Sequence, residues 1–232
     1  PLCIIFNQSL RLGIFPDDSK NARVIPLFKQ WEQNDLNNYY PISVISKVAK
    51  AFDGIAYDQL YTYLVDNDFI YKYQSGFHTT HSAVTALREA TSSWAYNVDL
   101  GKVNAVVLLD LKKAFDTVNH EILLSKLRNG ICDNEYSWMD SYLDNRRQRC
   151  SVNKPLSRSC SLSCGVPQGT ILGPLLFLLC INDLSNCLSN CQSRMYVDCI
   201  HLTYAGFSAD NIQSCLNDDL VALMTLNIDF TV

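Results

Sequence analysis

The stretch VNAVVLLDLKKAFDTVNHEILL, residues 103–124, combines the pattern of a buried strand with the pattern of a helix. Its first part is an almost unbroken apolar run that ends at Asp110, which is typical of a strand buried in a sheet. A carboxylate at the end of such a strand either faces a cleft or is a solvated turn residue. Asp116 comes shortly before the helical pattern, and we interpret it as a residue that stabilises the helix N-terminus.

Helical and strand patterns alternate along the rest of the chain without a linker, a repeat or a low-complexity tract. We therefore expect one α+β body. The clearest other strand is RVIPLF, Arg23–Phe28, whose Pro26 favours an edge position. The expected helices cover residues 47–65, with Ser46 as N-cap, and residues 82–100, 119–129, 134–143 and 211–226.

The stretch SCGVPQGTILGPLLF, residues 163–177, concentrates glycine and proline before a long apolar segment. Glycine lets the backbone approach a ligand closely, and proline fixes the shape of a loop. Gln168 lies between Pro167 and Gly169, so a stiff loop presents a side chain that can both donate and accept hydrogen bonds. These residues alone predict a structured loop followed by a buried helix.

The stretch SRMYVDCIHLTYAG, residues 193–206, holds Asp198 between two short apolar runs of β-prone residues. This pattern predicts a hairpin that carries a carboxylate at its tip. The residue after Asp198 is Cys199, whose thiol is a different kind of ligand from a second carboxylate.

The composition argues for a chain with a substantial core and against a strongly basic nucleic-acid binder. The chain has 232 residues, of which 48% are apolar, and its net charge is −4. The basic cluster NRRQR, residues 145–149, either contacts nucleic acid or forms a solvated turn. The longest apolar run, residues 174–181, is too short to span a bilayer, and the first residues show no secretory signal. We expect an intracellular fragment, in the cytoplasm or nucleus, that is neither secreted nor membrane-bound.

Two groups of residues resemble metal sites by spacing but have simpler interpretations. The chain has 10 cysteines, and two pairs have C-x3-C spacing, Cys160/Cys164 and Cys187/Cys191. Neither pair has a neighbouring histidine, so we favour free thiols over zinc. Two pairs of adjacent aspartates, Asp17/Asp18 and Asp218/Asp219, are expected in an exposed turn and on the solvated face of a helix.

Five stretches together resemble motifs of the reverse transcriptases of non-long-terminal-repeat (LINE-type, jockey-like) retrotransposons. They occur in the family's order within residues 1–226: NNYYPISVISKVAKAFD, QSGFHTTHSAVTAL, LLDLKKAFDTVNHEILLSKL, GVPQGTILGPLLF and MYVDCIHLTYAG. The resemblance implies a single reverse transcriptase domain fragment with the fingers and palm of a right-hand polymerase. The implied palm has a ferredoxin-like sheet with helices on one face. Residues 1–85 and 118–158 are assigned to the fingers and 86–117 and 159–232 to the palm, with the thumb absent.

The resemblance also implies a catalytic metal centre. It makes Asp110 and Asp198 the catalytic metal ligands, which hold two Mg²⁺ ions for which Mn²⁺ can substitute. One ion activates the primer 3′-hydroxyl, and the other steadies the incoming triphosphate. Carboxylate oxygens suit Mg²⁺, which is a hard cation.

The same resemblance implies a substrate site for a nucleotide. Phe115 matches the aromatic gate that excludes a ribose 2′-hydroxyl, and Gln168 and Gly169 match residues that meet the incoming nucleotide. Lys29 falls where the fingers present a phosphate-binding cation. The implied partners are an RNA template, a DNA primer and dNTPs, and no oligomeric state is indicated.

Three residues depart from the family's pattern at positions that contact metal or phosphate. Cys199 replaces the second aspartate of the hairpin, and a thiol matches Zn²⁺ or Cd²⁺ better than Mg²⁺. Tyr40 and His78 stand where the family usually has arginines, and neither supplies a fixed positive charge at neutral pH. The two-ion site is therefore expected to be impaired.

These departures leave two main hypotheses for function. The first is an RNA-directed DNA polymerase core of a mobile element. The second is a catalytically decayed relic that retains the fold and binds nucleic acid weakly at most. A third hypothesis, an RNA-binding module, is disfavoured by the low content of basic residues.

Overall fold

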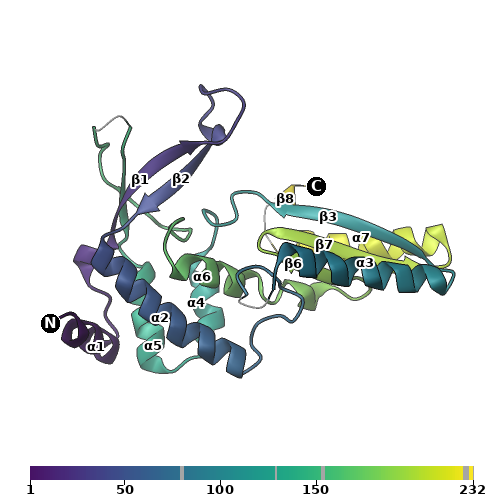
Figure 1. Ribbon diagram of the computed structural model, residues 1–232, viewed down its shortest axis with the longest axis horizontal. Coiled ribbons are helices and arrows are strands. Elements are labelled where there is room, and N and C mark those ends of the chain that lie inside the picture. The colour runs from purple at the N-terminus through teal and green to yellow at the C-terminus, as the bar shows by residue number, and fades with distance from the viewer. Residues whose placement is uncertain (79–80, 129, 153–154, 227–229, 232) are drawn as a thin grey trace. The chain divides into compact units, whose positions relative to one another are not determined.

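The computed structural model describes residues 1–78, 81–128, 130–152, 155–226 and 230–231 (Figure 1). The chain divides into two compact units. Unit 1 comprises Pro1–Asn67 and Phe115–Cys180, and unit 2 comprises Asp68–Ala114 and Ile181–Val232. Each unit therefore joins two stretches that are far apart in the sequence. The assignment of residue ranges to fingers and palm stays a prediction.

Unit 1 contains most of the helices. They are α1 (Leu2–Leu12), α2 (Lys47–Asp66), α4 (His120–Arg128), α5 (Asp133–Leu143) and α6 (Leu172–Ile181), whose last residue belongs to unit 2, and two 3₁₀ turns lie at Asp17–Lys20 and Leu36–Asn38. The expected helices at 47–65, 119–129 and 134–143 are confirmed, although Asn129 lies outside the described residues. Ser46 caps α2 as predicted, because its side chain accepts a hydrogen bond from the Ala49 amide.

An aromatic cluster forms the core of unit 1 between α1, α2 and α5. Phe6 stacks on Phe52 with a centroid distance of 4.3 Å, and Phe15 meets Trp138 edge-on at 5.3 Å. All four side chains are buried. Such ring pairs add to the hydrophobic stabilisation that fixes helices against one another.

The sheet of unit 1 has the strand order β2–β1–β4–β5. Its strands are β1 (Asn21–Phe28), β2 (Tyr39–Val44), β4 (Arg147–Cys150) and β5 (Cys160–Ser161). β1 pairs with β2 along 23–28 but with β4 only along 21–24. β1 is thus an inner strand, and the edge position expected from Pro26 is wrong. Pro26 is tolerated because it lies past the β4 pairing, where its missing amide costs no ladder hydrogen bond on that side.

The sheet of unit 2 has the strand order β6–β7–β3–β8. Its strands are β3 (Val103–Leu111), β6 (Gln192–Tyr196), β7 (Cys199–Gly206) and β8 (Phe230–Thr231), and a 3₁₀ turn lies at Leu184–Cys187. β3 and β7 pair antiparallel over their whole shared length, from Val103 opposite Gly206 to Asp110 opposite Cys199. The predicted strand and hairpin are confirmed.

Helices lie on both faces of this sheet, so the expectation of helices on one face is wrong (Figure 1). Trp94 of α3 (Ala83–Asp99) donates a hydrogen bond to Thr203, which pairs with Val106. Ile212 of α7 (Ala209–Met224) lines a cavity of about 360 Å³ with Val103 and Val107. Because successive strand residues point to opposite faces, the two helices contact opposite faces. The covering is partial, because Leu109 and Leu111 of β3 are buried whereas Val103, Val106 and Leu108 are exposed, so the expectation of a fully buried strand is wrong.

The length and apolarity of the described helices indicate whether any of them could span a membrane. None of them is both long and apolar enough to cross a membrane. The longest apolar run lies within α6, whose residues Leu172, Leu175 and Leu176 are fully buried in the protein. The apolarity of this helix is therefore explained by core packing.

Candidate active site

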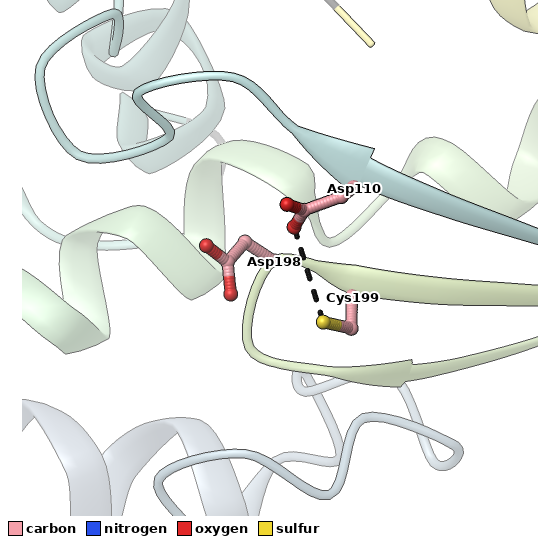
Figure 2. A group of neighbouring side chains, drawn as sticks. All are labelled: Asp110, Asp198 and Cys199. Atoms are coloured by element: carbon pink, nitrogen blue, oxygen red, sulfur yellow. Dashed lines mark hydrogen bonds between the residues drawn. The ribbon is translucent and has the colours of Figure 1, made fainter. Parts of the chain in front are cut away.

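Asp110, Asp198 and Cys199 converge where β3 meets the β6–β7 hairpin (Figure 2). Asp110 pairs with Cys199 in the β3–β7 ladder, and the Leu111 amide donates to the Asp198 carbonyl at 3.3 Å. One ligand atom from each of the three side chains lies within 4.8 Å of the others, and Cys199 Sγ is 3.9 Å from Asp110 Oδ1. Among the described residues no other group of three His, Cys, Asp or Glu side chains meets this closely.

The two carboxylates place negative charge beside a thiol in a partly buried environment. Burial raises the pKa of Asp198, and the nearby Asp110 carboxylate raises it further. Burial likewise raises the pKa of the Cys199 thiol, with further contributions from Asp110 and Asp198. A bound cation would offset this repulsion, so the electrostatics favour cation binding.

The hairpin turn that carries Asp198 is held by a segment earlier in the chain. Val197 has a φ of +59°, which is strained for a β-branched residue. The buried Gln74 side chain accepts hydrogen bonds from the amides of Val197, at 3.1 Å, and Gly76, at 2.8 Å. A Cβ at Gly76 would lie 2.4 Å from the Val197 amide nitrogen, so only glycine fits there. Gln74 and Gly76 therefore set the position of Asp198.

The motif QSGFHTTHSAVTAL therefore supports the hairpin turn that carries Asp198. This role was not predicted from the sequence, which placed the beginning of the motif in the fingers. Ser75 and Tyr73 also exchange backbone hydrogen bonds with Met195 of β6, at 2.8 and 2.9 Å. The available signal was the Gln-x-Gly spacing ahead of a helix. Thr79 and Thr80 of the motif lie outside the described residues. Burial, followed by the neighbouring His81, lowers the pKa of His78, which fits its predicted lack of a fixed charge.

The predicted substrate loop lies in unit 1 and packs against β2. Gln168 Nε2 donates to Asp116 Oδ1 at 3.0 Å, and the Ser43 amide donates to the Gln168 carbonyl at 2.6 Å. Gly169 has a φ of +106°, and a Cβ there would lie 2.7 Å from the Ser43 carbonyl oxygen. Glycine is therefore required for this close approach.

Helix α4 is capped by Asn119, whereas the residue expected from the sequence to stabilise its N-terminus was Asp116. Asn119 Oδ1 accepts the amides of Glu121 and Ile122 at 2.9 and 3.1 Å. Asparagine immediately before the first turn supplies this cap better than an aspartate several residues upstream. The Asp116 carboxylate orients the Gln168 side chain.

The remaining predicted substrate residues also lie in unit 1. The Phe115 ring packs on Phe177 with a centroid distance of 4.8 Å. Lys29 Nζ lies 3.9 Å from the centroid of the Tyr40 ring, a cation–π contact. The structure thus gathers Asp110, Asp198 and Cys199 in unit 2, and Phe115, Gln168, Gly169 and Lys29 in unit 1.

Asp53 of α2 anchors the substrate loop, and the sequence analysis did not identify it. Its Oδ2 accepts the amides of Ile171 and Leu172, at 2.8 and 3.3 Å, at the start of α6. Asp53 is 1% exposed, and this burial raises its pKa in spite of the two backbone hydrogen bonds. The available signal was its place on the buried stripe of α2, next to Phe52.

Arg146 of the basic cluster is buried, so neither a nucleic-acid contact nor a solvated turn describes it. It is 1% exposed, its Nη1 donates to the Tyr142 carbonyl at 3.0 Å, and its guanidinium lies 4.6 Å from the centroid of the Tyr142 ring. Arg147 and Arg149 are exposed on β4. The cluster therefore offers fewer surface charges than its sequence suggests.

The two aspartate pairs differ from each other. Asp17 and Asp18 are exposed in the 3₁₀ turn as expected, and Asp17 pairs with Lys20 at 2.8 Å. Asp218 is exposed, but Asp219 is 1% exposed, so a solvated face is wrong for Asp219. Asp219 accepts the amides of residues 189, 190 and 191, at 2.9, 3.0 and 2.6 Å. Burial opposes its ionisation, but these hydrogen bonds outweigh burial and lower its pKa.

The fold and the convergent carboxylates define a class of protein. The chain belongs to the reverse transcriptase family: the family described as "Reverse transcriptase (RNA-dependent DNA polymerase)" matches residues 29–227. The family that the five motifs predicted is confirmed.

Similar proteins come from mobile elements of Drosophila melanogaster. The chain is 31% identical over 154 residues to "RNA-directed DNA polymerase from mobile element jockey" and 30% identical over 157 residues to "Probable RNA-directed DNA polymerase from transposon BS". These matches cover 66% and 67% of the chain but only 17% of the length of each relative.

A solved structure shares the fold. It is telomerase from Candida albicans in complex with a TWJ fragment of telomeric RNA, which matches with a TM-score of 0.62 at 12% identity. The match covers 94% of this chain and 43% of that chain. At this identity the likeness concerns the fold alone, and it agrees with the expected α+β class.

Proposed function

We propose that this chain is the fingers and palm part of an RNA-directed DNA polymerase from a LINE-type, jockey-like mobile element. The observation that carries the proposal is the convergence of Asp110 and Asp198 from β3 and the β6–β7 hairpin. The substrates are an RNA template, a DNA primer and dNTPs. In the reaction the primer 3′-oxygen attacks the α-phosphorus of the dNTP, and pyrophosphate leaves.

The residues of unit 1 bind the incoming nucleotide in this proposal. Gln168 and Gly169 form a loop that is fixed on β2 and on α2, so the loop is preorganised for a substrate. Lys29 binds a phosphate, and Phe115 excludes the ribose 2′-hydroxyl. Preorganised groups of this kind lower the reorganisation that the transition state requires. An enzyme with these substrates acts in the cytoplasm or nucleus.

The donor set of the metal centre does not fit two Mg²⁺ ions well. Divalent cations, when bound, stabilise the charge that develops on the transferred phosphoryl group. Asp110 and Asp198 offer the oxygen ligands that Mg²⁺ prefers, and Mn²⁺ accepts the same ligands. Cys199 offers sulfur in the place of a third carboxylate.

The second candidate function is a relic that retains the fold without catalysis. Cys199 is the observation that favours it, because this thiol occupies the carboxylate cluster itself. Tyr40 points the same way, since its ring engages Lys29 in place of an arginine that would bind phosphate. Loss of electrostatic groups at an active site typically costs several kcal/mol of transition-state stabilisation, about tenfold in rate for each 1.4 kcal/mol.

Primer extension on an RNA template tests the proposal. The assay uses the chain itself and a chimera in which it replaces the matching segment of a jockey-like polymerase, with Mg²⁺ or Mn²⁺. Extension by the unaltered chain that Asp110→Asn abolishes supports the polymerase. Extension only after Cys199→Asp supports the relic.

The same chimera also allows a control and a result that would contradict the proposed function. Asp18→Asn, at an exposed turn, is the matched control and should leave any extension unchanged. If neither the unaltered chimera nor its Cys199→Asp variant extends the primer, while the parent polymerase does, the proposed function is wrong.

A further inference from the structure

The metal centre contains two oxygen donors and one sulfur donor held on a rigid frame. Asp110 and Cys199 are directly opposite each other on paired strands, and the Leu111 amide binds the Asp198 carbonyl. The Gln74 side chain fixes the turn between Tyr196 and Cys199 through Val197. The three donors therefore approach one another because of the backbone, whether or not the chain catalyses any reaction.

The spacing of the donors suits a small cation that accepts sulfur. Zinc–sulfur bonds of about 2.3 Å and zinc–oxygen bonds of about 2.1 Å in a tetrahedral site place sulfur and oxygen about 3.6 Å apart. Cys199 Sγ and Asp110 Oδ1 are already 3.9 Å apart. Asp198 has a donor atom within 4.8 Å of both, so small side-chain rotations bring all three onto one ion.

The same donors suit magnesium poorly. Mg²⁺ requires near-octahedral oxygen coordination at about 2.0–2.1 Å and has little affinity for sulfur. Zn²⁺, Cd²⁺ and Co²⁺ accept a thiolate together with carboxylates. Asp110 and Cys199 are exposed and Asp198 is half-buried, so a cation can enter from solvent.

We propose that Asp110, Asp198 and Cys199 form a binding site for a thiophilic divalent cation of the zinc type, which the site prefers over Mg²⁺. The cation takes one oxygen from each aspartate and the sulfur of Cys199, and a water molecule completes the coordination. Binding replaces the thiol proton: the S–H bond breaks, the sulfur–metal bond forms and the proton passes to solvent. The replacement of an aspartate by Cys199 thus changes which metal the centre selects.

The remaining cysteines give the proposal its controls. Cys191 and Cys215 are half-buried near Asp219, whose oxygens already accept three backbone amides. The Asp219 carboxylate therefore already binds the backbone of residues 189–191. Cys215 is a thiol outside the metal centre, which makes Cys215→Ser a suitable matched variant.

Cadmium titration tests the proposal, because the sulfur-to-cadmium charge-transfer absorption reports the bond to a thiolate directly. Cd²⁺ is added to the whole reduced chain with excess Mg²⁺ present, and the measurement is repeated for Cys199→Ser, Asp110→Asn and Cys215→Ser. We expect Cys199→Ser and Asp110→Asn each to weaken Cd²⁺ binding at least about 10- to 100-fold, since loss of a direct ligand exceeds a typical outer-shell effect. Cys215→Ser should bind as the unaltered chain does.

Several outcomes would overturn the proposal. It is wrong if Cys215→Ser loses the absorption while Cys199→Ser keeps it, or if Asp110→Asn binds Cd²⁺ unchanged, since a lone thiol then explains the signal. It is equally wrong if excess Mg²⁺ displaces Cd²⁺ from the unaltered chain. Circular dichroism checks that each variant is folded, and Cys199→Ser changes a single exposed atom.

The reverse exchange supplies a second, independent measurement. Cys199→Asp should remove the charge-transfer absorption at this site and raise the affinity for Mn²⁺, measured by the loss of the free Mn²⁺ signal in electron paramagnetic resonance. Unchanged Mn²⁺ affinity in this variant would contradict the proposal. Neither readout depends on polymerase activity, so the metal site and the proposed function can fail separately.

Discussion

Asp53 is a single buried carboxylate that joins two parts of unit 1. It lies on α2 and accepts the first amides of α6, which follow the Gln168 loop directly. Tyr142 and Arg146 lie beside it, and the Arg146 charge partly offsets the cost of burying the carboxylate. A buried acid at this junction fixes the loop more firmly than an apolar contact would, because its hydrogen bonds are directional.

Two substitutions of Asp53 should distinguish the contribution of its hydrogen bonds to stability from the contribution of its charge. Asp53→Ala removes the acceptor for Ile171 and Leu172 and should lower the free energy of unfolding by about 1–2 kcal/mol, as for a lost helix cap. Asp53→Asn keeps an acceptor oxygen and should lose less. Urea denaturation of both variants measures the difference, and equal losses would contradict the capping role.

The pH dependence of the same variants has a definite sign. The pKa of Asp53 is raised in the folded state, so folding favours its protonated form. Its contribution to stability is therefore complete below the ordinary aspartate pKa and is lost as the pH rises through the higher folded pKa. The unaltered chain should gain stability relative to Asp53→Asn as the pH falls from neutral toward that ordinary value. A difference that is constant with pH would contradict this assignment.

At the scale of elements, the β6–β7 hairpin and residues 73–76, which precede α3, form one hydrogen-bonded structure. Gly76 touches the Val197 backbone, and Gln74 binds the same residue, so the turn is shaped from outside. The strain of a positive φ at Val197 is sustained by these contacts. The position of Asp198 therefore depends on residues that are remote in sequence.

Gly76→Ala should disrupt this arrangement. The added Cβ would meet the Val197 amide nitrogen at 2.4 Å, and backbone cannot move aside cheaply. We expect a loss of about 1–3 kcal/mol in the free energy of unfolding, as for overpacked sites. Thermal or urea denaturation measures it.

Gly54→Ala is the matched control for that substitution. Gly54 lies within helix α2, and a Cβ there would have its nearest contact at an ordinary 3.5 Å from Ile171 Cδ1. Alanine in a helix interior should be neutral or stabilising by about 0.5–1 kcal/mol. Equal effects of the two substitutions would show that the Gly76 contact does not matter.

At the scale of the whole molecule, the charge distribution limits nucleic-acid binding. The chain has 19 basic and 23 acidic residues, and Lys20 and Arg146 are buried. We expect the isolated chain to bind a primer–template duplex only weakly, with a Kd of about 10⁻⁴ to 10⁻⁶ M, the range of non-specific binding at physiological salt. Fluorescence anisotropy over a series of salt concentrations measures this, and nanomolar binding would contradict it.

Much of the fold follows from local patterns in the sequence. Apolar periodicity predicted β3, the β6–β7 hairpin and helices α2, α3, α4, α5 and α7 to within a few residues, because local propensity and burial agree there, but it did not predict α1. The motifs also predicted that Asp110 and Asp198 meet. These features follow from the pattern of apolar residues within each element and from the pairing of whole strands.

The remaining features could not be predicted because polar residues are expected at the surface. Asp53, Arg146 and Asp219 are buried against that expectation. Backbone partners from distant segments bind Asp53 and Asp219, whereas Arg146 binds the Tyr142 carbonyl one helical turn earlier. The hydrogen bond between Gln74 and the hairpin residue Val197 is likewise a long-range contact that no local sequence pattern indicates. Long-range polar contacts of this kind become visible only in three dimensions.

The pairing of Tyr73 and Ser75 with Met195 has a consequence beyond the position of Asp198. It pairs the outward-facing amide and carbonyl of Met195 on the outer side of β6. Exposed strand edges of this kind recruit strands from other molecules and promote aggregation. At the other side of the sheet, β8 pairs with β3 at Asp110 and Leu111 alone among the described residues, so it does not cover the rest of that edge. The segment that shapes the hairpin thus also shields the β6 edge against pairing with strands of other molecules.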